Sequence, residues 1–407
     1  MKPVTLGPFL GMNNRLPAEK LHVPREGDFV SSAVNGDFTA AGTFRRRKGF
    51  APVVVGTSTH SLVGFDDIGF VVEENHLCSL HKEEDGTIVR NAIYTVTQNL
   101  QFSYTRAPLA IYASNGREFL RIDRDSVLPV GLPSPDEPRV SAIGGGLPPG
   151  VYQVAVSYRD ASGRDSGVSL TARIELPIGG GISIDYAAEH PAADTVLYMT
   201  APNGDQLFET NLPGYSGQVI TALPAEGARP VAMMTAPLPA GQIVRYHRGK
   251  LYSAAGALLF FSEPYGLELC DLAENCIPFP EPIALVEPCV NGLYISADKT
   301  YWLSTDDMKL TPVLPYKAVG GTGNVRRDSE EVWWMSTRGL VRGDQTGTVE
   351  NMQEERVAVS PAMYGASLMR EEDGEKQFVA TSFDPRQTVT AARAWIDAEV
   401  IRKETQL

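Results

Sequence analysis

The sequence predicts an all-β protein: a β-propeller-like body of about five to seven blades, with an inserted β-sandwich module and an extended N-terminal arm. Two observations lead to this prediction. Glycine and proline, 38 and 29 of the 407 residues, interrupt apolar stretches throughout the chain without a collagen-like period, as is typical of proteins with many turns between short strands. Helical periodicity is almost absent, because few windows of a dozen residues without Gly or Pro repeat apolar residues at helical spacing.

The recurring unit is a short apolar strand, a polar or glycine turn, and a second apolar strand. It occurs in GFVVEENHLCSL, LAIYASNGREFLRI, KLYSAAGALLFFS, GLYISADKTYWLS, EVWWMSTRGLVRG and KQFVATSFDP. Equivalent positions are Phe70, Ile111, Leu251, Leu293, Val332 and Phe378. Their separations are 41, 140, 42, 39 and 46 residues, and all but one fall near the roughly 40–45-residue period of four-stranded propeller blades. Because each such sheet buries both faces only between neighbours, the units are expected to stack.

The one long separation predicts an insertion between two blades. Subtracting a period of 42 from 140 leaves 98 residues, about the size of one small sandwich domain. Within residues 136–229, VYQVAVSY and VSLTARIEL alternate apolar and polar residues around a turn at Asp160–Gly167, and ISIDY, TVLYMTA and QLFETNL follow. This pattern resembles a fibronectin type III-like or immunoglobulin-like sandwich. Two further irregular blades are the alternative interpretation.

These patterns divide the chain into four segments: 1–50, the arm with a hairpin; 51–135, the first propeller blades; 136–229, the sandwich module; and 230–407, the second group of blades with a closing C-terminal segment. In the arm, Val34–Phe38 and Thr43–Arg46 are expected to pair across a turn in which Gly42 takes a positive φ. At the other end, the stretch TVTAARAWIDAEVIRKE predicts either a closing strand or a short helix over 391–403.

The charge balance limits the function. The formal net charge is −13 and the isoelectric point is near 5.0, which argues against a protein whose main task is to hold nucleic acid, although DNA could pass without being captured. The N-terminal stretch lacks the continuous apolar core of a signal peptide, and no stretch approaches the ~20 apolar residues that span a bilayer. We therefore expect a protein without a membrane span that is made and assembled in the cytoplasm.

Patterns that indicate catalysis or cofactor binding are weak. The acidic clusters Asp66–Asp67, Asp306–Asp307 and Glu371–Asp373 lie in turn-like stretches and are interpreted as solvated loop acids. The stretch SADKTYW at Ser296–Trp302 does not supply, in register, the Gly and Thr of the Ser-x-Asp-x-Gly-x-Thr-Trp box of sialidase-like propellers, so it predicts a structural turn. The sequence therefore predicts a protein that is not an enzyme, with no catalytic residue and no cofactor.

Metal and phosphate sites are equally poorly supported. The six histidines form no HExxH or HxH pair, and the four cysteines are expected to be buried free thiols. The stretch GGTGNVRR at Gly320–Arg327 lacks the Lys-Ser/Thr of a phosphate-binding loop and predicts a loop between blades. The glycine runs 144–146 and 179–181 predict turns.

Several stretches resemble a known family. The combination of GMNNRLP, AVNGDF, a glycine-containing turn and FRRRKGF is similar to the opening of bacteriophage tail structural proteins, including nozzle or tubular subunits with propeller bodies. LPAGQIVRYHRGKLYSAAGALLFFSEPYGLE and NCIPFPEPIALVEPCVNGLYI resemble stretches from the middle of those proteins. None of these stretches is a catalytic motif.

The resemblance implies a structural subunit of the virion tail: a nozzle, tube or hub ring, hexameric, that forms part of the conduit for DNA ejection. The expected partners are further copies of the chain, adaptor or other tail proteins, and double-stranded DNA in passage only. A receptor-binding or fibre-attachment protein of the tail tip is the alternative. A propeller glycan hydrolase is the third candidate.

The basic run Arg45, Arg46, Arg47 and Lys48 supplies the only candidate site residues. Three interpretations compete: a solvated turn edge, a contact with an acidic neighbouring subunit, and a contact with DNA phosphates in a lumen. The acidity of the chain makes the DNA contact the weakest of the three.

Overall fold

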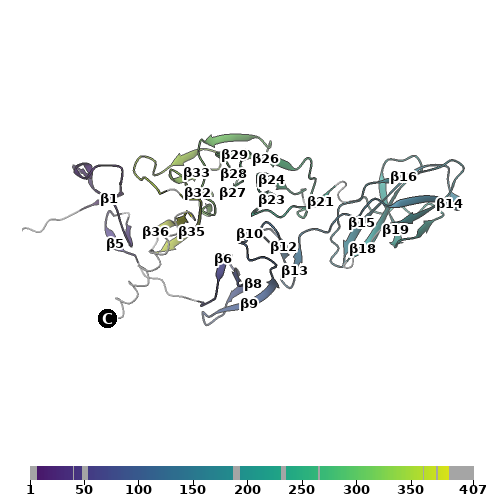
Figure 1. The fold of residues 1–407 in the computed structure, drawn as a ribbon, viewed down its shortest axis with the longest axis horizontal. Helices are drawn as coiled ribbons and strands as arrows, with labels where there is room; N and C mark the ends of the chain where they lie inside the picture. Colours follow the sequence, from purple (N-terminus) through teal and green to yellow (C-terminus); the bar gives the residue numbers. More distant parts are fainter. Residues whose placement is uncertain are drawn as a thin grey trace, which may run out of the picture. The chain divides into compact units, whose positions relative to one another are not determined.

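The computed structural model describes residues 7–39, 41–47, 54–186, 193–230, 235–264, 266–360, 362–372 and 375–384. Apart from one short 3-10 helix, η1 (Ala18–Lys20), the regular elements in these ranges are strands, which confirms the all-β fold class (Figure 1). No helix in these ranges is long and apolar enough to cross a membrane. The chain divides into two compact units: unit 1, with Met1–Thr57, Lys82–Ile88 and Phe279–Leu407, and unit 2, with Ser58–His81 and Val89–Pro278.

Unit 2 contains three four-stranded antiparallel sheets of the kind that form propeller blades. Their strands are β6 (Thr59–Gly64), β7 (Gly69–Glu73), β8 (His76–Lys82) and β9 (Ile88–Thr95); β10 (Ser103–Arg106), β11 (Ile111–Ser114), β12 (Phe119–Ile122) and β13 (Val127–Pro129); and β22 (Ile243–His247), β23 (Lys250–Ala255), β24 (Leu258–Phe261) and β26 (Cys276–Pro278). The short strands β21 (Ala236–Pro237) and β25 (Leu269–Cys270) form a separate pair. The predicted hairpins at β7–β8, β11–β12 and β23–β24 are present.

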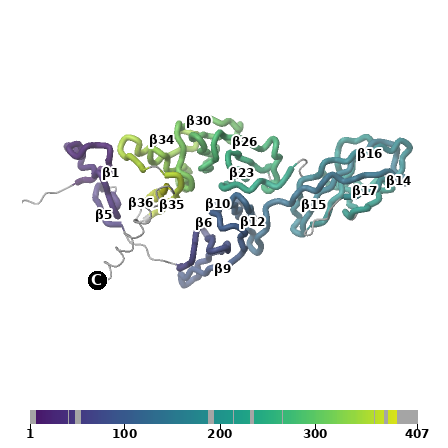
Figure 2. Tube along the Cα trace, in the orientation of Figure 1, coloured from purple at the N-terminus to yellow at the C-terminus, as the bar shows by residue number. Residues whose placement is uncertain are grey.

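The sheets of unit 2 stack face to face. On β11, Ile111 and Ala113 join the core shared with the β6–β9 sheet, and Tyr112 joins the core shared with the β22–β26 sheet, because successive side chains of a strand point to opposite faces. Thr105 of β10 also accepts a 2.8 Å hydrogen bond from the backbone N–H of Tyr246 on β22. The blades before and after the insertion are thus direct neighbours (Figure 2).

The inserted module is a two-layer sandwich. Its three-stranded sheet has the order β14-β17-β20 and its four-stranded sheet the order β16-β15-β18-β19. The strands are β14 (Arg139–Leu147), β15 (Gly150–Asp160), β16 (Ala172–Leu176), β17 (Gly180–Asp185), β18 (Ala193–Thr200), β19 (Leu207–Gly214) and β20 (Gln218–Ile220). Ile182 and Ile184 of one sheet meet Val154, Val156 and Leu197 of the other in a single core. Where the module joins the body, the Ser134 hydroxyl donates a 2.7 Å hydrogen bond to the carbonyl of Thr235.

The first glycine run of the module is not a turn, so that prediction is wrong. Residues 144–146 lie inside β14, opposite Gly180 and Gly181 at the start of β17, and the pairing register shifts between Ile143 and Leu147. A Cβ atom on Gly145 would lie only 2.5 Å from the Gly180 carbonyl oxygen. Glycine is required at this bulge because two backbones approach more closely than any side chain allows.

Unit 1 contains two further blade-like sheets, β27–β30 and β31–β34, and a final two-stranded sheet, β35–β36. The strands are β27 (Leu285–Cys289), β28 (Gly292–Ser296), β29 (Thr300–Ser304), β30 (Leu310–Leu314), β31 (Asn324–Arg326), β32 (Glu331–Ser336), β33 (Gly339–Gly343), β34 (Val349–Asn351), β35 (Tyr364–Glu372) and β36 (Glu375–Phe383). Tyr294 of β28 packs against Trp334 of β32, with ring centroids 5.2 Å apart. The glycine-rich part of the stretch Gly320–Arg327, residues 320–323, connects these sheets as predicted, and Gly320 pairs with Tyr364 of β35. Residues 324–326 form β31, so the prediction of a loop is wrong for that part.

One predicted hairpin is wrong. The stretch KQFVATSFDP forms the single strand β36, which pairs with the upstream strand β35 in the register Met369↔Phe378. The apolar residues of β35 stop at Met369, and the strand ends in charged residues from Arg370 onward, so apolar and polar residues do not alternate along its whole length. The predicted strand or helix at 391–403 lies outside the described residues.

The arm contains strands that its sequence does not predict. β1 (Phe9–Met12) pairs in parallel with β3 (Gly27–Val30), and β2 (His22–Val23) pairs with β3 on its other edge. The predicted hairpin is present as β4 (Gly36–Phe38) and β5 (Phe44–Arg46), with Gly42 at φ +73°. Within unit 1, Asn14 exchanges hydrogen bonds with Ala358, so the arm is docked against the segment that follows β34.

A single carboxylate connects the module to its two flanking blades. Glu268 accepts a 3.0 Å hydrogen bond from Arg121 of β12 and another of 3.0 Å from Arg164 of the module. It also accepts a 2.7 Å hydrogen bond from the Gly131 N–H. The Glu268 side chain is only 12% exposed. Since buried charge-assisted bonds are stronger than exposed ones, this residue is expected to restrain the module.

We expect Glu268→Gln to loosen the module without unfolding it, because the amide oxygen can still accept from Gly131 but the charge opposite the two arginines is lost. The expected cost is about 1–3 kcal/mol. Limited proteolysis monitored by mass spectrometry should show faster cleavage between the module and the body. Glu281→Gln, which removes the half-exposed partner of Lys317, is the control; equal cleavage rates in both variants would contradict this role.

Candidate functional site

The basic run lies on the β4–β5 hairpin and divides between its two faces. Gly36 pairs with Arg46, Asp37 with Arg45 and Phe38 with Phe44. Because side chains alternate along a strand, Arg46 shares a face with Phe44, whereas Arg45 lies on the opposite face. Lys48 lies outside the described residues. The described arginines therefore do not form one continuous phosphate-binding surface.

One face of the hairpin is aromatic. Phe38 and Phe44 lie with ring centroids 5.1 Å apart, and Phe9 of β1 is 6.1 Å from Phe38 and 6.3 Å from Phe44. Phe44 also covers Gly36, where a Cβ atom would collide with its ring. This cluster holds the hairpin on the rest of the arm, but Phe44 itself stays 44% exposed.

The other face carries an ion-pair cluster. One carboxylate oxygen of Asp37 accepts hydrogen bonds of 3.0 and 2.6 Å from the Nε and Nη2 atoms of Arg47. The other oxygen of Asp37 lies 3.5 Å from the guanidinium of Arg370 on β35. The hydrogen bond from Arg47 is the main cause that holds the pKa of Asp37 below its usual range, although burial opposes it. Arg47 therefore serves an intramolecular contact, while the exposed Arg46 has no ion pair among the described residues.

Two members of the acidic clusters make local contacts in the described structure. Asp67 accepts hydrogen bonds of 2.6 and 3.1 Å from Arg106 through its two oxygens. Asp307 accepts a hydrogen bond from the Lys309 N–H in the turn between β29 and β30. Asp298, in the predicted turn between β28 and β29, accepts a 2.8 Å hydrogen bond from the Tyr301 hydroxyl. Asp373 lies outside the described residues.

The cysteines are free thiols, as predicted, with Cys78, Cys270 and Cys289 buried and Cys276 half-buried. Burial raises the pKa of Cys270 to about 12 and that of Cys289 to about 11. Within the described ranges, no group of three or more His, Cys, Asp or Glu side chains is arranged to hold a metal ion.

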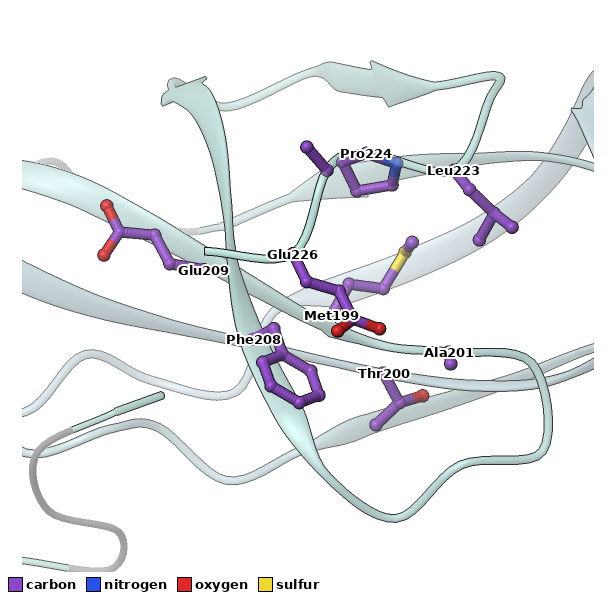
Figure 3. Close-up of a pocket in the computed structure, with 9 residues that line it drawn as sticks. Met199, Thr200, Ala201, Phe208, Glu209, Leu223, Pro224 and Glu226 are labelled. Carbon is purple, nitrogen blue, oxygen red and sulfur yellow. The ribbon is translucent and has the colours of Figure 1, made fainter. Parts of the chain in front are cut away.

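A shallow hollow on the module was not predicted from the sequence. Its apolar lining comes from Met199, Phe208 and Leu223, and Thr200, Ala201, Glu209, Pro224, Ala225 and Glu226 complete it. Figure 3 shows Phe208 and Glu226 among the side chains that line the hollow, whereas the Glu209 carboxylate points away from the Phe208 ring. The hollow forms because the segment after β20 returns along β19, where Glu209 exchanges backbone hydrogen bonds with Gly227 and Ala228. This long-range pairing leaves no local signal in the sequence.

No protein-family model and no curated protein matches the chain. Among solved structures, it is similar to a streptogramin B lyase, with 11% identity, coverage of 81% of this chain and 95% of that chain, and a TM-score of 0.31. It is also similar to AztD from Citrobacter koseri, with 8% identity, coverage of 84% and 91%, and a TM-score of 0.26. At these values the similarities carry no argument about function. The class of protein rests on the sheets themselves: an all-β chain with a propeller-like body.

We expect Asp37→Asn to loosen the β4–β5 hairpin, because it removes the charge opposite Arg47 and Arg370. Hydrogen exchange of the hairpin amides should accelerate, whereas Glu26→Gln, an exposed change in the same arm, should not alter it. Since the pKa of Asp37 is lowered in the folded state, the contribution is fully present above its unfolded pKa and is lost as the pH falls below that value. Unchanged exchange at neutral pH would contradict the pairing.

We further expect Cys270 and Cys289 to resist alkylation in the folded protein at pH 8, since their raised pKa values and burial leave almost no accessible thiolate. Mass spectrometry after iodoacetamide treatment should find Cys276 modified first and all four cysteines modified only after denaturation. Labelling of Cys270 or Cys289 as fast as Cys276 would show that these sheets open readily.

Proposed function

We propose that the protein is a structural subunit of a bacteriophage tail, a nozzle, tube or hub component that assembles with copies of itself into a ring around the path of the DNA. Support for the tail assignment comes from the resemblance of the arm sequence and of the two central stretches to such proteins. Support for self-assembly comes from one structural observation, an exposed apolar face on the last sheet of unit 1.

This apolar face consists of Tyr364 and Leu368 on β35 and Phe383 on β36. The three side chains are 52%, 50% and 53% exposed, and Tyr364 pairs directly with Phe383 across the two strands. The opposite face of the same sheet is packed, because Phe378 lies against Trp333 of β32 with ring centroids 6.4 Å apart. Exposed apolar patches of this kind mark interaction surfaces.

The inner strands of the blade-like sheets lack exposed apolar residues of this kind. β11 and β28 are buried at every residue, because each of these strands has packing partners on both faces. A copy of the chain that covers the apolar face would give β35–β36 its second partner. Burial of three large apolar side chains contributes about 1.5–3 kcal/mol for each one fully covered.

The acidity of the chain suits a conduit. A net charge of −13 gives the subunit a surface that repels DNA phosphates weakly at physiological salt, so DNA can slide past without binding. The other tail proteins of the proposed assembly, an adaptor above or a tip protein below, would dock on the faces of the ring.

The test is the mass of the purified chain by multi-angle light scattering and the symmetry of its particles by electron microscopy. The proposed function predicts a ring, with about six times the 44.1 kDa of one chain for a hexamer, and localisation of the protein to the tail of the virion. A chain that stays monomeric at every concentration, or a virion tail that lacks it, would overturn the proposal.

Leu368→Asp is expected to weaken assembly at least about tenfold, because a charge would be buried in the covered apolar face. The melting temperature of the isolated chain should hardly change. Ile178→Asp is the matched control, because Ile178 is 92% exposed in the module. If Leu368→Asp instead lowers the melting temperature and leaves the mass unchanged, the face is covered by the chain's own residues and does not support self-assembly.

A further inference from the structure

Opposite charges are segregated along this chain. Residues 1–50 carry eight Lys and Arg against four Asp and Glu, a net charge of +4. Residues 136–229 carry five Arg, no Lys and eleven Asp and Glu, a net charge of −6. The arm and the module therefore attract each other, whereas two arms or two modules repel.

The hollow on the module offers an apolar floor beside an acid without a partner. Met199, Phe208 and Leu223 line it, and Leu223 is 47% exposed. Glu226 is exposed and has no ion pair in the described part of the chain. Phe208 already accepts one guanidinium on its ring, since Arg229 lies 5.7 Å from the ring centroid. A second cation arriving beside Phe208 would meet the Glu226 carboxylate.

The hairpin of the arm presents the complementary groups. Phe44 and Arg46 lie on the same face of β5 and both are exposed. Phe44 keeps 44% of its surface exposed although it packs against Phe9 and Phe38, and Arg46 is a cation without an ion pair among the described residues. The other face of the hairpin is engaged by Asp37, Arg47 and Arg370, so only the Phe44–Arg46 face is available to a partner.

We propose that the hollow on the module of one copy binds the β4–β5 hairpin of a second copy, with Phe44 on the apolar floor and Arg46 paired with Glu226. This inference rests on the proposed ring. A cyclic ring of more than two copies needs two different, mutually complementary surfaces on each subunit, one for each neighbour. The basic arm and the acidic module are such a pair, and their opposite charges exclude the wrong arm-to-arm and module-to-module contacts.

The charge pair is tested by reversal. Arg46→Glu and Glu226→Arg each place like charges opposite one another, and each is expected to weaken ring assembly at least about tenfold. The double variant, Arg46→Glu with Glu226→Arg, should restore assembly, because the pair is re-formed with opposite polarity. Matched controls are Arg15→Glu, exposed in the arm outside the hairpin, and Glu175→Arg, exposed on β16 at the opposite edge of the same sheet. Both controls should assemble normally.

Mixing the two single variants shows which chains are in contact. In an alternating ring the reversed arm of one variant meets the reversed hollow of the other, and the remaining contacts are native, so a 1:1 mixture should assemble although each variant alone does not. If the contact is made within one chain, mixing restores nothing. Circular dichroism of each variant establishes that it is folded.

The outcomes separate the two proposals. A wild-type chain that forms no ring overturns the proposed function and, with it, the proposed contact between hairpin and hollow. A wild-type ring that both single reversals leave intact overturns only the hairpin-to-hollow contact. Single reversals that disrupt the ring, without rescue by the double variant, also overturn the pairing of Arg46 with Glu226. Rescue in the double variant and in the mixture supports it.

Discussion

Burial of both faces of a strand is the constraint on which this structure depends. β11 and β28 are buried along their whole length, and their polar residues Ser114 and Ser296 are enclosed with the rest. Each polar group is satisfied by a neighbouring segment: Ser114 donates to the Gly241 carbonyl, and Ser296 accepts from the Ala318 N–H. Stacking of the sheets therefore satisfies apolar and polar groups together, and a sheet without a neighbour loses both.

The parts of this fold that follow from local rules could be predicted from the sequence. Paired apolar strands around a polar turn identify β7–β8, β11–β12, β23–β24, β28–β29 and β32–β33, because alternation and turn residues act over about a dozen positions. The one long interval between successive hairpins, from β11–β12 to β23–β24, locates the module. Neighbouring blades must stack against each other, so the extra residues between them have to form a separate domain. Gly42 was identified in the same way, from the positive φ that its turn needs.

What escaped prediction depends on distant partners. β1 pairs with β3 in parallel, and Phe9 meets Phe44 at a sequence separation of 35 residues. The hollow forms only because the segment after β20 returns to β19. Glu268 finds Arg121 and Arg164 at sequence separations of 147 and 104 residues. The candidate residues Arg45–Arg47 were identified by composition, but the structure alone shows that Arg47 is engaged by Asp37 while Arg46 is exposed.

The hydrogen bond between Ser134 and Thr235 places the start and the end of the inserted sandwich at one point. The chain therefore leaves the body and returns to it at the same place, and the blades on either side of the insertion are in contact with each other. The roughly one hundred residues between these two points therefore form an inserted domain. Such an insertion can be lengthened, exchanged for another domain or removed while the contact between the two flanking blades is kept, which makes this position tolerant of variation.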